Sequence, residues 1–344
     1  MGHPRPTFIH NRGEFLQPTD RVEAGVFAFL PALPDKAKPD RLAFARWLVS
    51  PENPLTARVT VNRQWAILFG RGLVRTTEDF GYQGEPPSHP ELLDWLAVEF
   101  VKQGWSLKKL HRLIVTSATY RQSSRITPEL LAKDAENKLL ARGPRGRLDA
   151  EIIRDSTLRA AGLLSEKIGG PSVYPPQQEG VSEVAYGGGK WNASAGEDRY
   201  RRGLYTFIKR TAPYAMLTTF DAPTGEACIA RRDVSNSPLQ ALTLLNDVVF
   251  IEAAQALGKK LASEPGSVEE RIASLFRRCH TRPPTADETA LLAKFFTTQK
   301  ARFISKELDA QAIAGEGSGD ANERAAWTAL ARAMFNLDEA VTKG

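Results

Sequence analysis

Residue types that build metal and disulfide sites are scarce in this sequence. Its 344 residues include two cysteines, Cys228 and Cys279, which allow at most one disulfide and form no Cys-x-x-Cys or Cys-x-x-Cys-His motif. The five histidines are scattered, whereas metal ligands usually recur at a regular spacing. We therefore expect no metal site, no paired-thiol redox chemistry and no covalently attached haem in this chain.

Long apolar runs are also missing. No run of about eighteen apolar residues occurs, so we expect no membrane span. Residues 1–10 lack the apolar core of a secretory signal, so we expect no export signal there. Gly187–Lys190 lacks the upstream glycine of a phosphate-binding loop, and Trp191 stands where that loop needs Ser or Thr.

Positive charge is in mild excess and partly clustered. Hydrophobic residues make up 42% of the chain and charged residues 25%, the balance of a globular protein, with a net charge of +6. Between residues 199 and 232 the acids are only Asp221 and Glu226, and such a basic cluster can bind anions. The basic residues of this stretch are Arg199, Arg201, Arg202, Lys209, Arg210, Arg231 and Arg232.

Hydrophobic periodicity predicts a mainly α fold: a multi-helix domain with a small irregular or β segment at its centre. Four capping boxes mark helix starts, at Ser88/Glu91, Ser237/Gln240, Ser267/Glu270 and Thr285/Glu288. The expected helices cover residues 40–50, 53–69, 88–104, 148–167, 237–261 and 324–341, with further helices starting at 106, 267 and 285.

The prolines and glycines suggest how these helices are organised. Residues 1–39 are rich in proline, and we expect an extended, irregular linker or the tail of a preceding domain. Residues 40–304 then form a helical domain with an irregular centre at 171–235. A flexible acidic loop is expected over 305–324, before a last helix in 325–344 that packs back on the domain.

The irregular centre holds the strongest candidate for a binding site. Gly203–Lys209 and Ala227–Ala230 look like strands, and arginines surround the first of them. Guanidinium groups bind sulfate, phosphate or carboxylated sugars through paired hydrogen bonds. The alternative is a structural network in which these arginines pair with Asp198, Asp221 or Asp233. The candidate anion-binding residues are Arg199, Arg201, Arg202, Arg210, Arg231 and Arg232.

Catalytic candidates lie in the same region. Asp221, Glu226 and Cys228 combine two acids and a thiol beside arginines that would lower the pKa of the thiol. No histidine is near in sequence to act as a base, so a buried cysteine and a turn at Asp221 are the structural alternative. Whether the chain is an enzyme stays open.

A second cluster of acids lies between residues 76 and 91. Its carboxylates and its one imidazole would suit acid–base chemistry or a metal. Helix capping already accounts for Ser88 and Glu91, which favours a structural role for the segment. The residues concerned are Glu78, Asp79, Glu85, His89 and Glu91.

Several blocks of this sequence resemble a known family, the PSD-type domain of unknown function 1553, over roughly residues 38–300 in collinear order. Two departures from its pattern are Thr224-Gly-Glu226 after the Phe-Asp-Ala-Pro turn, where Asp-Arg-Glu is expected, and Ser235-Asn-Ser-Pro238 for Thr-Asn-Thr-Pro. The blocks are Phe69–Val74, Glu78–Gly81, Pro86–Leu96, Ser117–Ser124, Leu148–Glu151, Gly169–Val173, Phe220–Pro223 and Arg231–Asp247.

This resemblance implies a context rather than a reaction. Family members are typically large exported proteins of planctomycetes and related bacteria, in which a signal peptide, a cytochrome c domain with haem c and a second domain of unknown function come first. We therefore expect this chain to be the C-terminal module of a longer protein of the periplasm or cell envelope, with its preceding domains as partners. No cofactor is expected in the chain itself.

Three functions follow from these observations. The first is a non-catalytic module that binds a partner domain or an anionic ligand. The second is a hydrolytic enzyme acting on an anionic polysaccharide through Asp221, Glu226 and the arginines. The third and least favoured is nucleic-acid binding, for which Tyr200, Tyr205 and Phe207 among the arginines are suggestive but insufficient.

Overall fold

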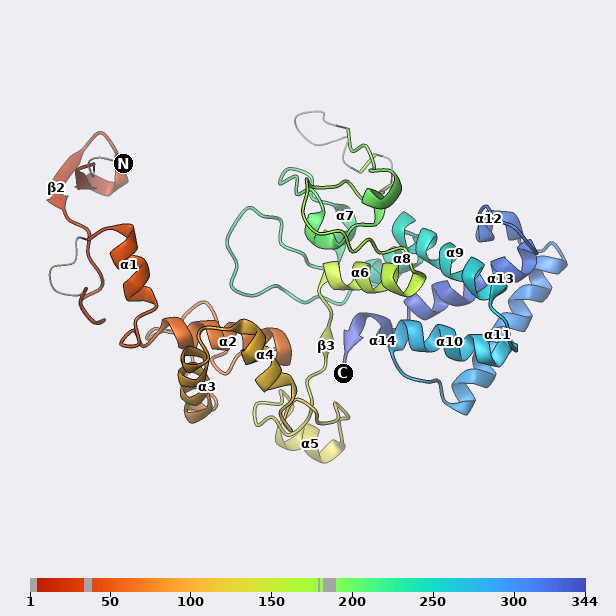
Figure 1. Cartoon of the computed structure of the whole chain (residues 1–344), viewed down its shortest axis with the longest axis horizontal. Helices are drawn as coiled ribbons and strands as arrows, with labels where there is room; N and C mark the ends of the chain where they lie inside the picture. The colour runs from red at the N-terminus through yellow and green to blue at the C-terminus, as the bar shows by residue number, and fades with distance from the viewer. Residues whose placement is uncertain (1–4, 34–38, 179, 182–189) are drawn as a thin grey trace. The chain divides into compact units, whose positions relative to one another are not determined.

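The structure, a computed structural model, consists of two compact units, residues 1–144 and 145–344 (Figure 1). Part of the expected linker, Pro34–Lys38, and the glycines Gly187–Gly189 lie outside the described residues. The described residues are 5–33, 39–178, 180–181 and 190–344. Within them helices dominate and strands form only two small sheets, so the mainly α prediction is confirmed.

The first unit begins with a hairpin that the sequence did not indicate. Its strands pair antiparallel, with Thr7 opposite Val22, and Pro18 starts the second strand, a position that tolerates proline. The helices α1 to α4 follow in the order expected, and α5 is a short helix that was not expected. The elements are β1 (Thr7–His10), β2 (Pro18–Val22), α1 (Arg41–Leu48), α2 (Thr56–Phe69), α3 (Pro90–Lys102), α4 (Leu107–Val115) and α5 (Pro128–Lys133).

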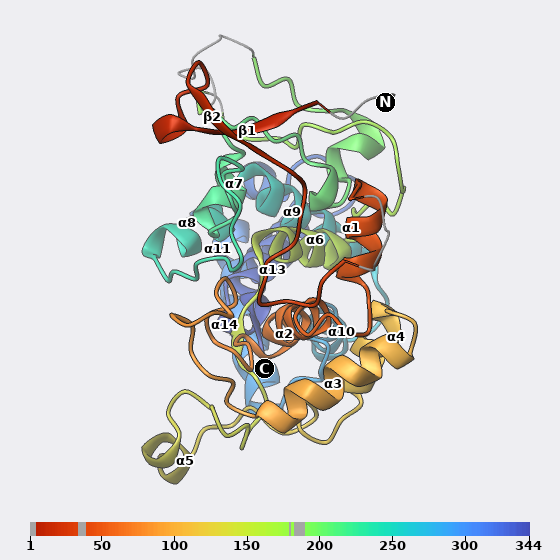
Figure 2. The same cartoon turned by 90° about the vertical axis from the view of Figure 1, so that its left-hand side faces the viewer.

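The core of the first unit lies between α2, α3 and α4, which pack against one another (Figure 2). Trp65, Leu96 and Leu110 are among its buried side chains. Asn62 on α2 is fully buried and is satisfied by the backbone of Val74, with both hydrogen bonds 2.9 Å long. This polar contact fixes the chain that leaves α2 against the helix itself.

The second unit is larger and contains the irregular centre of the chain. Two short 3₁₀ turns, Gly196–Tyr200 and Gly203–Tyr205, are its main regular features between α6 and α7. The elements are β3 (Gly146–Arg147), α6 (Ala150–Ala161), α7 (Ala215–Thr219), α8 (Pro238–Asn246), α9 (Val248–Ser263), α10 (Val268–His280), α11 (Ala286–Ile304), α12 (Ala310–Ala314), α13 (Ala321–Phe335), α14 (Asp338–Val341) and β4 (Thr342–Lys343).

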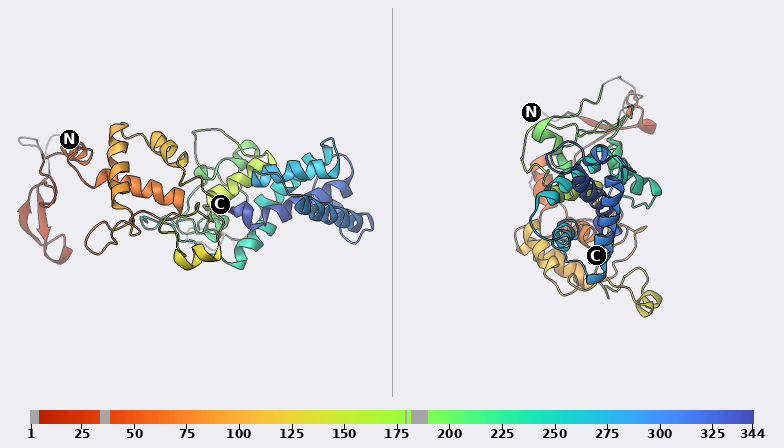
Figure 3. Two further views of the ribbon diagram at one scale, coloured as in Figure 1. Left: turned by 90° about the horizontal axis from the view of Figure 1, so that it is seen from below. Right: turned by 90° about the vertical axis from the view of Figure 1, so that its right-hand side faces the viewer.

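Helices α9 and α13 form the centre of this unit, and α6, α10, α11 and α12 pack around them (Figure 3). Leu257 on α9 and Trp327 on α13 are both fully buried. The two helices approach closely because Gly258 faces Thr328, where no side chain separates the backbones. The last long helix therefore contributes a large part of the core, including Trp327 and Leu330.

The predicted helix starts had mixed outcomes. Both reciprocal hydrogen bonds of the capping box form at Ser267 and at Thr285, so these two predictions are confirmed. At Ser237 no side-chain cap forms, and α3 starts at Pro90 with His89 rather than Ser88 as its N-cap. Those two capping boxes are wrong, although proline does occupy the first helical position in both helices.

Helix ends and strands also differ from the expectation. The helix expected over 148–167 ends at Ala161, because Gly162 adopts a left-handed conformation. The helix expected over 237–261 breaks between α8 and α9, and the chain bends by 51° from one helix to the next. Residues 203–209 form a 3₁₀ turn and one bridge, Val173 to Thr206, instead of a strand, and no strand forms at 227–230. The expected loop at 305–324 contains α12.

In the part of the chain that is described, no single helix has the length and apolar character needed to cross a membrane. The bent pair α8 and α9 meets that test of length and composition only when the two helices are taken together.

The Gly258→Ala substitution tests the close approach of α9 and α13. A Cβ at this position would lie 2.3 Å from Thr328 Oγ1 and 2.7 Å from its backbone nitrogen. We expect a loss of about 1–3 kcal/mol in the free energy of unfolding from this overlap, although alanine favours a helix over glycine by about 1 kcal/mol. Urea unfolding measures it.

Gly146→Ala is the matched control, since no atom lies within 4 Å of a Cβ there. It should change the free energy of unfolding by no more than about 0.5 kcal/mol. A Gly258→Ala variant as stable as the wild type would show that the two helices are not in close contact.

Candidate functional site

Arg199 forms an internal ion pair in the second unit. Its guanidinium binds the carboxylate of Glu252 on α9 in a bidentate manner, with the Nε–Oε2 contact 3.1 Å long. Tyr200 donates its hydroxyl to the same carboxylate at 3.0 Å. The hydrogen bonds that Arg199 donates to Glu252 raise the pKa of Arg199 above its usual value. Both oxygens of Glu252 are therefore used in holding this segment to α9.

Arg201 is the most buried of the candidate arginines, with 1% of its surface exposed. Its guanidinium donates to the backbone oxygens of Lys167 and Gly169, at 3.1 and 2.6 Å, and lies over the Tyr205 ring. The fully buried Arg154 of α6 donates in turn to the backbone oxygen of Arg201. These hydrogen bonds compensate two buried charges with backbone dipoles.

Three candidate arginines remain exposed. Arg202 lies 4.0 Å from Asp155, a weak contact for a side chain that is half exposed. For Arg210 and Arg231 the structure gives no ion pair within the described part of the chain. A Cβ on Gly225 would lie 3.7 Å from Arg210 Cγ, so the loop after α7 runs beside Arg210. Anion binding by the full set of six stays a prediction.

Asp221 is the centre of a clamp that we define as Arg147, Asp221 and Ser235. Arg147 donates to Asp221 Oδ2 at 2.6 Å and to the backbone oxygen of Phe220 at 3.1 Å. Ser235 donates to the same carboxylate from both its backbone N–H, at 2.8 Å, and its hydroxyl. Asp221 itself has φ of +60°, a left-handed conformation that Asp and Asn tolerate.

The clamp lowers the pKa of Asp221. Burial alone would raise it, but the hydrogen bonds from Ser235 and the charge of Arg147 outweigh burial. Near neutral pH the carboxylate therefore stays ionised, and both of its oxygens accept hydrogen bonds from Arg147 or Ser235. A general base needs a pKa near the working pH and a free oxygen, and Asp221 has neither property.

A second ion pair anchors the same loop. Arg232 donates to both oxygens of Glu151 in the first turn of α6, at 2.6 and 3.1 Å. Burial acts to raise the pKa of Glu151, and the hydrogen bond from Arg232 more than offsets it, so the pKa is lowered. The loop from 222 to 235 is thus tied down near both of its ends.

Glu226 and Cys228 lie on the exposed part of this loop. The structure gives neither side chain a hydrogen bond or ion pair to Asp221, whose described partners are Arg147 and Ser235. Both cysteines are free, so the disulfide that the sequence allowed does not form. The three catalytic candidates therefore share a loop but are not joined in a reacting group.

A groove of about 330 Å³ lies next to the clamp, between α7 and α8. Met216 on α7 and Leu239 and Leu242 on α8 give it an apolar wall, and both leucines are more than half exposed. Ligand sites commonly have this size and composition, with a few polar groups that fix orientation. The lining residues are Gln177, Gln178, Val181, Ala215, Met216, Thr219, Leu239, Leu242, Thr243, Asn246 and Asp247.

Asp247 and Gln177 are two of the polar side chains that line the groove. Asp247 accepts a hydrogen bond from the Val249 N–H at 3.0 Å and so caps α9. Burial raises the pKa of Asp247, because the charged form loses hydration. Gln177 carries a buried Oε1 that has no hydrogen-bond partner within the described residues. Both groups can accept a hydrogen bond from an occupant.

A family model described as a protein of unknown function, DUF1553, matches residues 40–296 under the family name PSD1. The chain belongs to this family. The resemblance expected from the sequence is thereby confirmed. Neither the curated proteins nor the solved structures contain a match to the chain.

Three of the blocks that resemble the DUF1553 family contribute to the clamp and the groove. The first contributes the carboxylate that binds Arg232, and the second contributes the carboxylate at the centre of the clamp. The third includes Arg232 and α8, which forms one wall of the groove. The three blocks are Leu148–Glu151, Phe220–Pro223 and Arg231–Asp247.

The acidic cluster of the first unit has local structural partners in this DUF1553 chain. Glu85 pairs with Arg75, Asp79 accepts from the Gly81 N–H at 2.6 Å, and His89 Nδ1 lies 3.0 Å from Ser88 Oγ. Glu78 accepts from Thr77, and Glu91 lies in the first turn of α3. Among the described residues, no three His, Cys, Asp or Glu side chains gather as a metal site.

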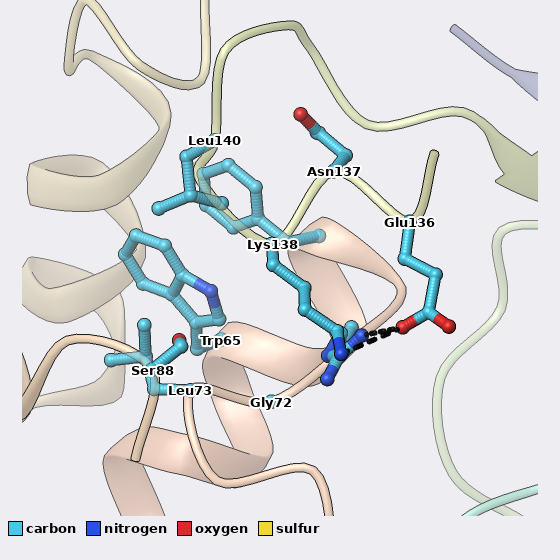
Figure 4. A pocket seen from close by; sticks show the side chains of 10 residues that line it. Trp65, Gly72, Leu73, Ser88, Glu136, Asn137, Lys138 and Leu140 are labelled. Carbon is cyan, nitrogen blue, oxygen red and sulfur yellow. Dashed lines mark hydrogen bonds and ion pairs between the residues drawn. The ribbon is translucent and has the colours of Figure 1, made fainter. Parts of the chain in front are cut away.

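The first unit also has a small cavity of about 40 Å³ beside Trp65 (Figure 4). Glu136 closes one side of it through ion pairs with Arg71 and Lys138, which the dashed lines mark. The space suits about one water molecule rather than an organic ligand. The groove of the second unit is therefore the better candidate site.

Asp221→Asn tests the clamp, since asparagine keeps the left-handed backbone but loses the ion pair with Arg147. We expect a loss of about 1–3 kcal/mol in unfolding free energy at pH 7. The folded pKa of Asp221 is depressed, so its stabilisation is present above the unfolded pKa of about 4 and is lost as pH falls further. The difference between variant and wild type should therefore shrink in acid.

Glu226→Gln is the control for this measurement, because Glu226 is exposed. In urea unfolding at pH 7 and at lower pH, the free energy of unfolding of this variant should stay within about 0.5 kcal/mol of the wild-type value. Equal stability of the Asp221→Asn variant and the wild type at pH 7 would contradict the clamp.

The two thiols should differ in reactivity. Cys228 is exposed, whereas burial raises the pKa of Cys279 to about 12. The thiolate is the reactive form, so at pH 8 one thiol of the native chain should react rapidly with Ellman's reagent, and partly buried Cys279 should react much more slowly until the chain is unfolded. Cys228→Ser should remove the rapid phase. Two equally fast thiols would contradict the burial of Cys279.

Proposed function

We propose that this DUF1553 module is a non-catalytic binding module and that the groove between α7 and α8 is its binding site. The observation that carries the proposal is the groove itself, where an apolar wall remains exposed beside acceptor oxygens. Exposed apolar patches with a polar rim are typical of interaction sites. The occupant we propose is a short apolar segment of a partner domain that carries a hydrogen-bond donor.

The exposed leucines of α8 support an apolar occupant. Leu239 and Leu242 are 58% and 54% exposed, and both line the groove. They lie three residues apart and therefore on one face of the helix. Covering one leucine removes apolar surface from water and is worth about 1.5–3 kcal/mol when burial is complete.

The charge of the groove supports a donor on the occupant. Asp247 and Gln177 Oε1, which has no hydrogen-bond partner in the described part of the chain, are both acceptors. An ammonium or amide group that donates to these oxygens would replace the hydrogen bonds to water that they lose when the occupant covers the groove. Because burial raises the pKa of Asp247, a bound cation would also stabilise its ionised form.

Occupied side chains argue against the hydrolytic alternative. The Asp221 carboxylate is held by three donors, while Glu226 is exposed on the loop. Arg199, Arg201 and Arg232 bind internal acceptors instead of a substrate anion. Hydrolysis of an anionic polysaccharide and nucleic-acid binding stay hypotheses, and turnover that is lost in Glu226→Gln would favour the first of them.

The setting we propose is the C-terminal part of an exported bacterial protein with a haem c domain before this module. The DUF1553 assignment supports this setting through the contexts typical of the family. The reading frame upstream of Met1 tests it. An in-frame Cys-x-x-Cys-His domain and a signal peptide would support the setting, and a stop codon directly upstream would contradict it.

Binding of the neutral apolar dye Nile red tests the groove. Leu242→Asp should weaken binding by at least about tenfold, because it puts a charge on the apolar wall. Leu204→Asp is the matched control, since Leu204 is 71% exposed and does not line the groove. The control should bind as the wild type does. Equal binding by all three proteins would contradict the proposal.

Competition experiments test the donor requirement. 2-Phenylethylamine should displace the dye more effectively than the neutral 2-phenylethanol, and Asp247→Asn should remove most of that difference. If the alcohol and the amine compete equally well with the wild type, the polar end of the groove plays no part in recognition.

A further inference from the structure

Arg324 is a buried cation without a counter-charge among the residues that the structure describes. It lies in the first turns of α13 and is 3% exposed. Its Nε and Nη1 atoms have no hydrogen-bond partner, and the described residues provide no ion pair for it. A buried guanidinium with no counter-charge and with two nitrogens that lack a hydrogen bond is destabilising, so a missing partner is expected.

Other buried arginines of the chain are compensated, which sets Arg324 apart. Arg154 donates to the backbone oxygens of Arg199 and Arg201. Arg201 itself uses backbone oxygens, and Arg142 donates to those of Asp134 and Ala135. In each case the chain supplies the acceptors.

The guanidinium of Arg324 is directed at the glycine-rich loop before α13. A Cβ on Gly317 would lie 2.0 Å from Nη1, so the loop passes directly over the guanidinium at a residue without a side chain. Helical side chains lean toward the N-terminus of their helix, which accounts for this direction. The same Cβ would lie 3.5 Å from Cδ of Lys259 on α9, so a second cation borders the loop.

The start of α13 adds further donors. Asp320 caps the helix by accepting the Asn322 N–H at 2.9 Å. Within the described chain no acceptor is given for the N–H groups of Ala321 and Glu323. The positive end of a 15-residue helix therefore lies beside two cationic side chains.

Nearby acids do not neutralise this site. Glu323 faces away from it and binds Lys300, Arg271 and Trp327. Glu316 and Asp320 are exposed. Water screens exposed carboxylates, so their repulsion of an anion is weak compared with the attraction between the anion and a buried guanidinium.

We propose that Arg324, Lys259 and the loop Gly315–Gly319 bind a tetrahedral oxyanion, a phosphate or sulfate group, at the N-terminus of α13. The guanidinium supplies donors in a planar fork, Lys259 supplies a point charge, and the glycines let the backbone approach the anion closely. None of these residues lines the groove, so the site is independent of the proposed function.

Thermal unfolding of the whole chain at constant ionic strength tests the site. Millimolar phosphate or sulfate should raise Tm along a saturating curve, whereas chloride should not. Glucose 6-sulfate forms a third arm. If glucose 6-sulfate raises Tm as the inorganic ions do, the site accepts a phosphate or sulfate group carried by a larger ligand. If only the inorganic ions raise Tm, the site binds the free ion. No saturable shift with any of the three would overturn the proposal.

Three variants separate the site from general salt effects. Arg324→Met removes the buried charge while keeping apolar bulk, so it should fold with an equal or higher Tm and lose the saturable shift. Lys259→Ala should lower the affinity for the anion by about tenfold. Lys260→Ala, also exposed on α9, is the control and should leave the shift unchanged. A saturable shift that persists in Arg324→Met would overturn the proposal.

Discussion

The Asp221 carboxylate is the contact on which the candidate site depends. It follows α7 directly, and its partners come from the strand before α6 and from the segment before α8. One charged group thereby ties two parts of the irregular centre, where few regular backbone hydrogen bonds exist, to the strand before α6. The two walls of the groove, α7 and α8, are joined by a further hydrogen bond from Gln240 to the backbone oxygen of Thr219, 3.0 Å long. The groove is thus held by polar contacts together with the apolar packing of Met216, Phe220 and Leu244.

Local signals in the sequence predicted the regular parts of the fold. The capping boxes at Ser267 and Thr285 depend on residues three apart and form as expected. The box at Ser237 failed because Gln240 turns instead to Thr219 and Ser235, a tertiary contact that replaces the local one. The break between α8 and α9 has a visible signal in hindsight, since Asp247 is itself a good N-cap.

The candidate site was harder to predict because its contacts are distant in sequence. The basic cluster was visible, but its partners Glu252 and Glu151 lie 53 and 81 residues from the arginines they bind. The sequence suggested Asp198, Asp221 and Asp233 as partners of the arginines. Within the described residues only Asp221 of these three pairs with an arginine, Arg147, which lies outside the cluster, while Asp198 pairs with Lys167. Spacing along the chain therefore indicated that charges would pair without indicating which ones. The groove had no signal of its own, because its apolar residues look like ordinary core positions of α8.

Hydrogen exchange measured by mass spectrometry tests the role of the clamp most directly. In Arg147→Met, whose side chain keeps the apolar stem, exchange should accelerate in α7, α8 and the loop between them, while α9 and α13 stay protected. That pattern would show that one ion pair holds the walls of the groove in place. Unchanged exchange in α7 and α8, or a uniform increase across the second unit, would contradict this account.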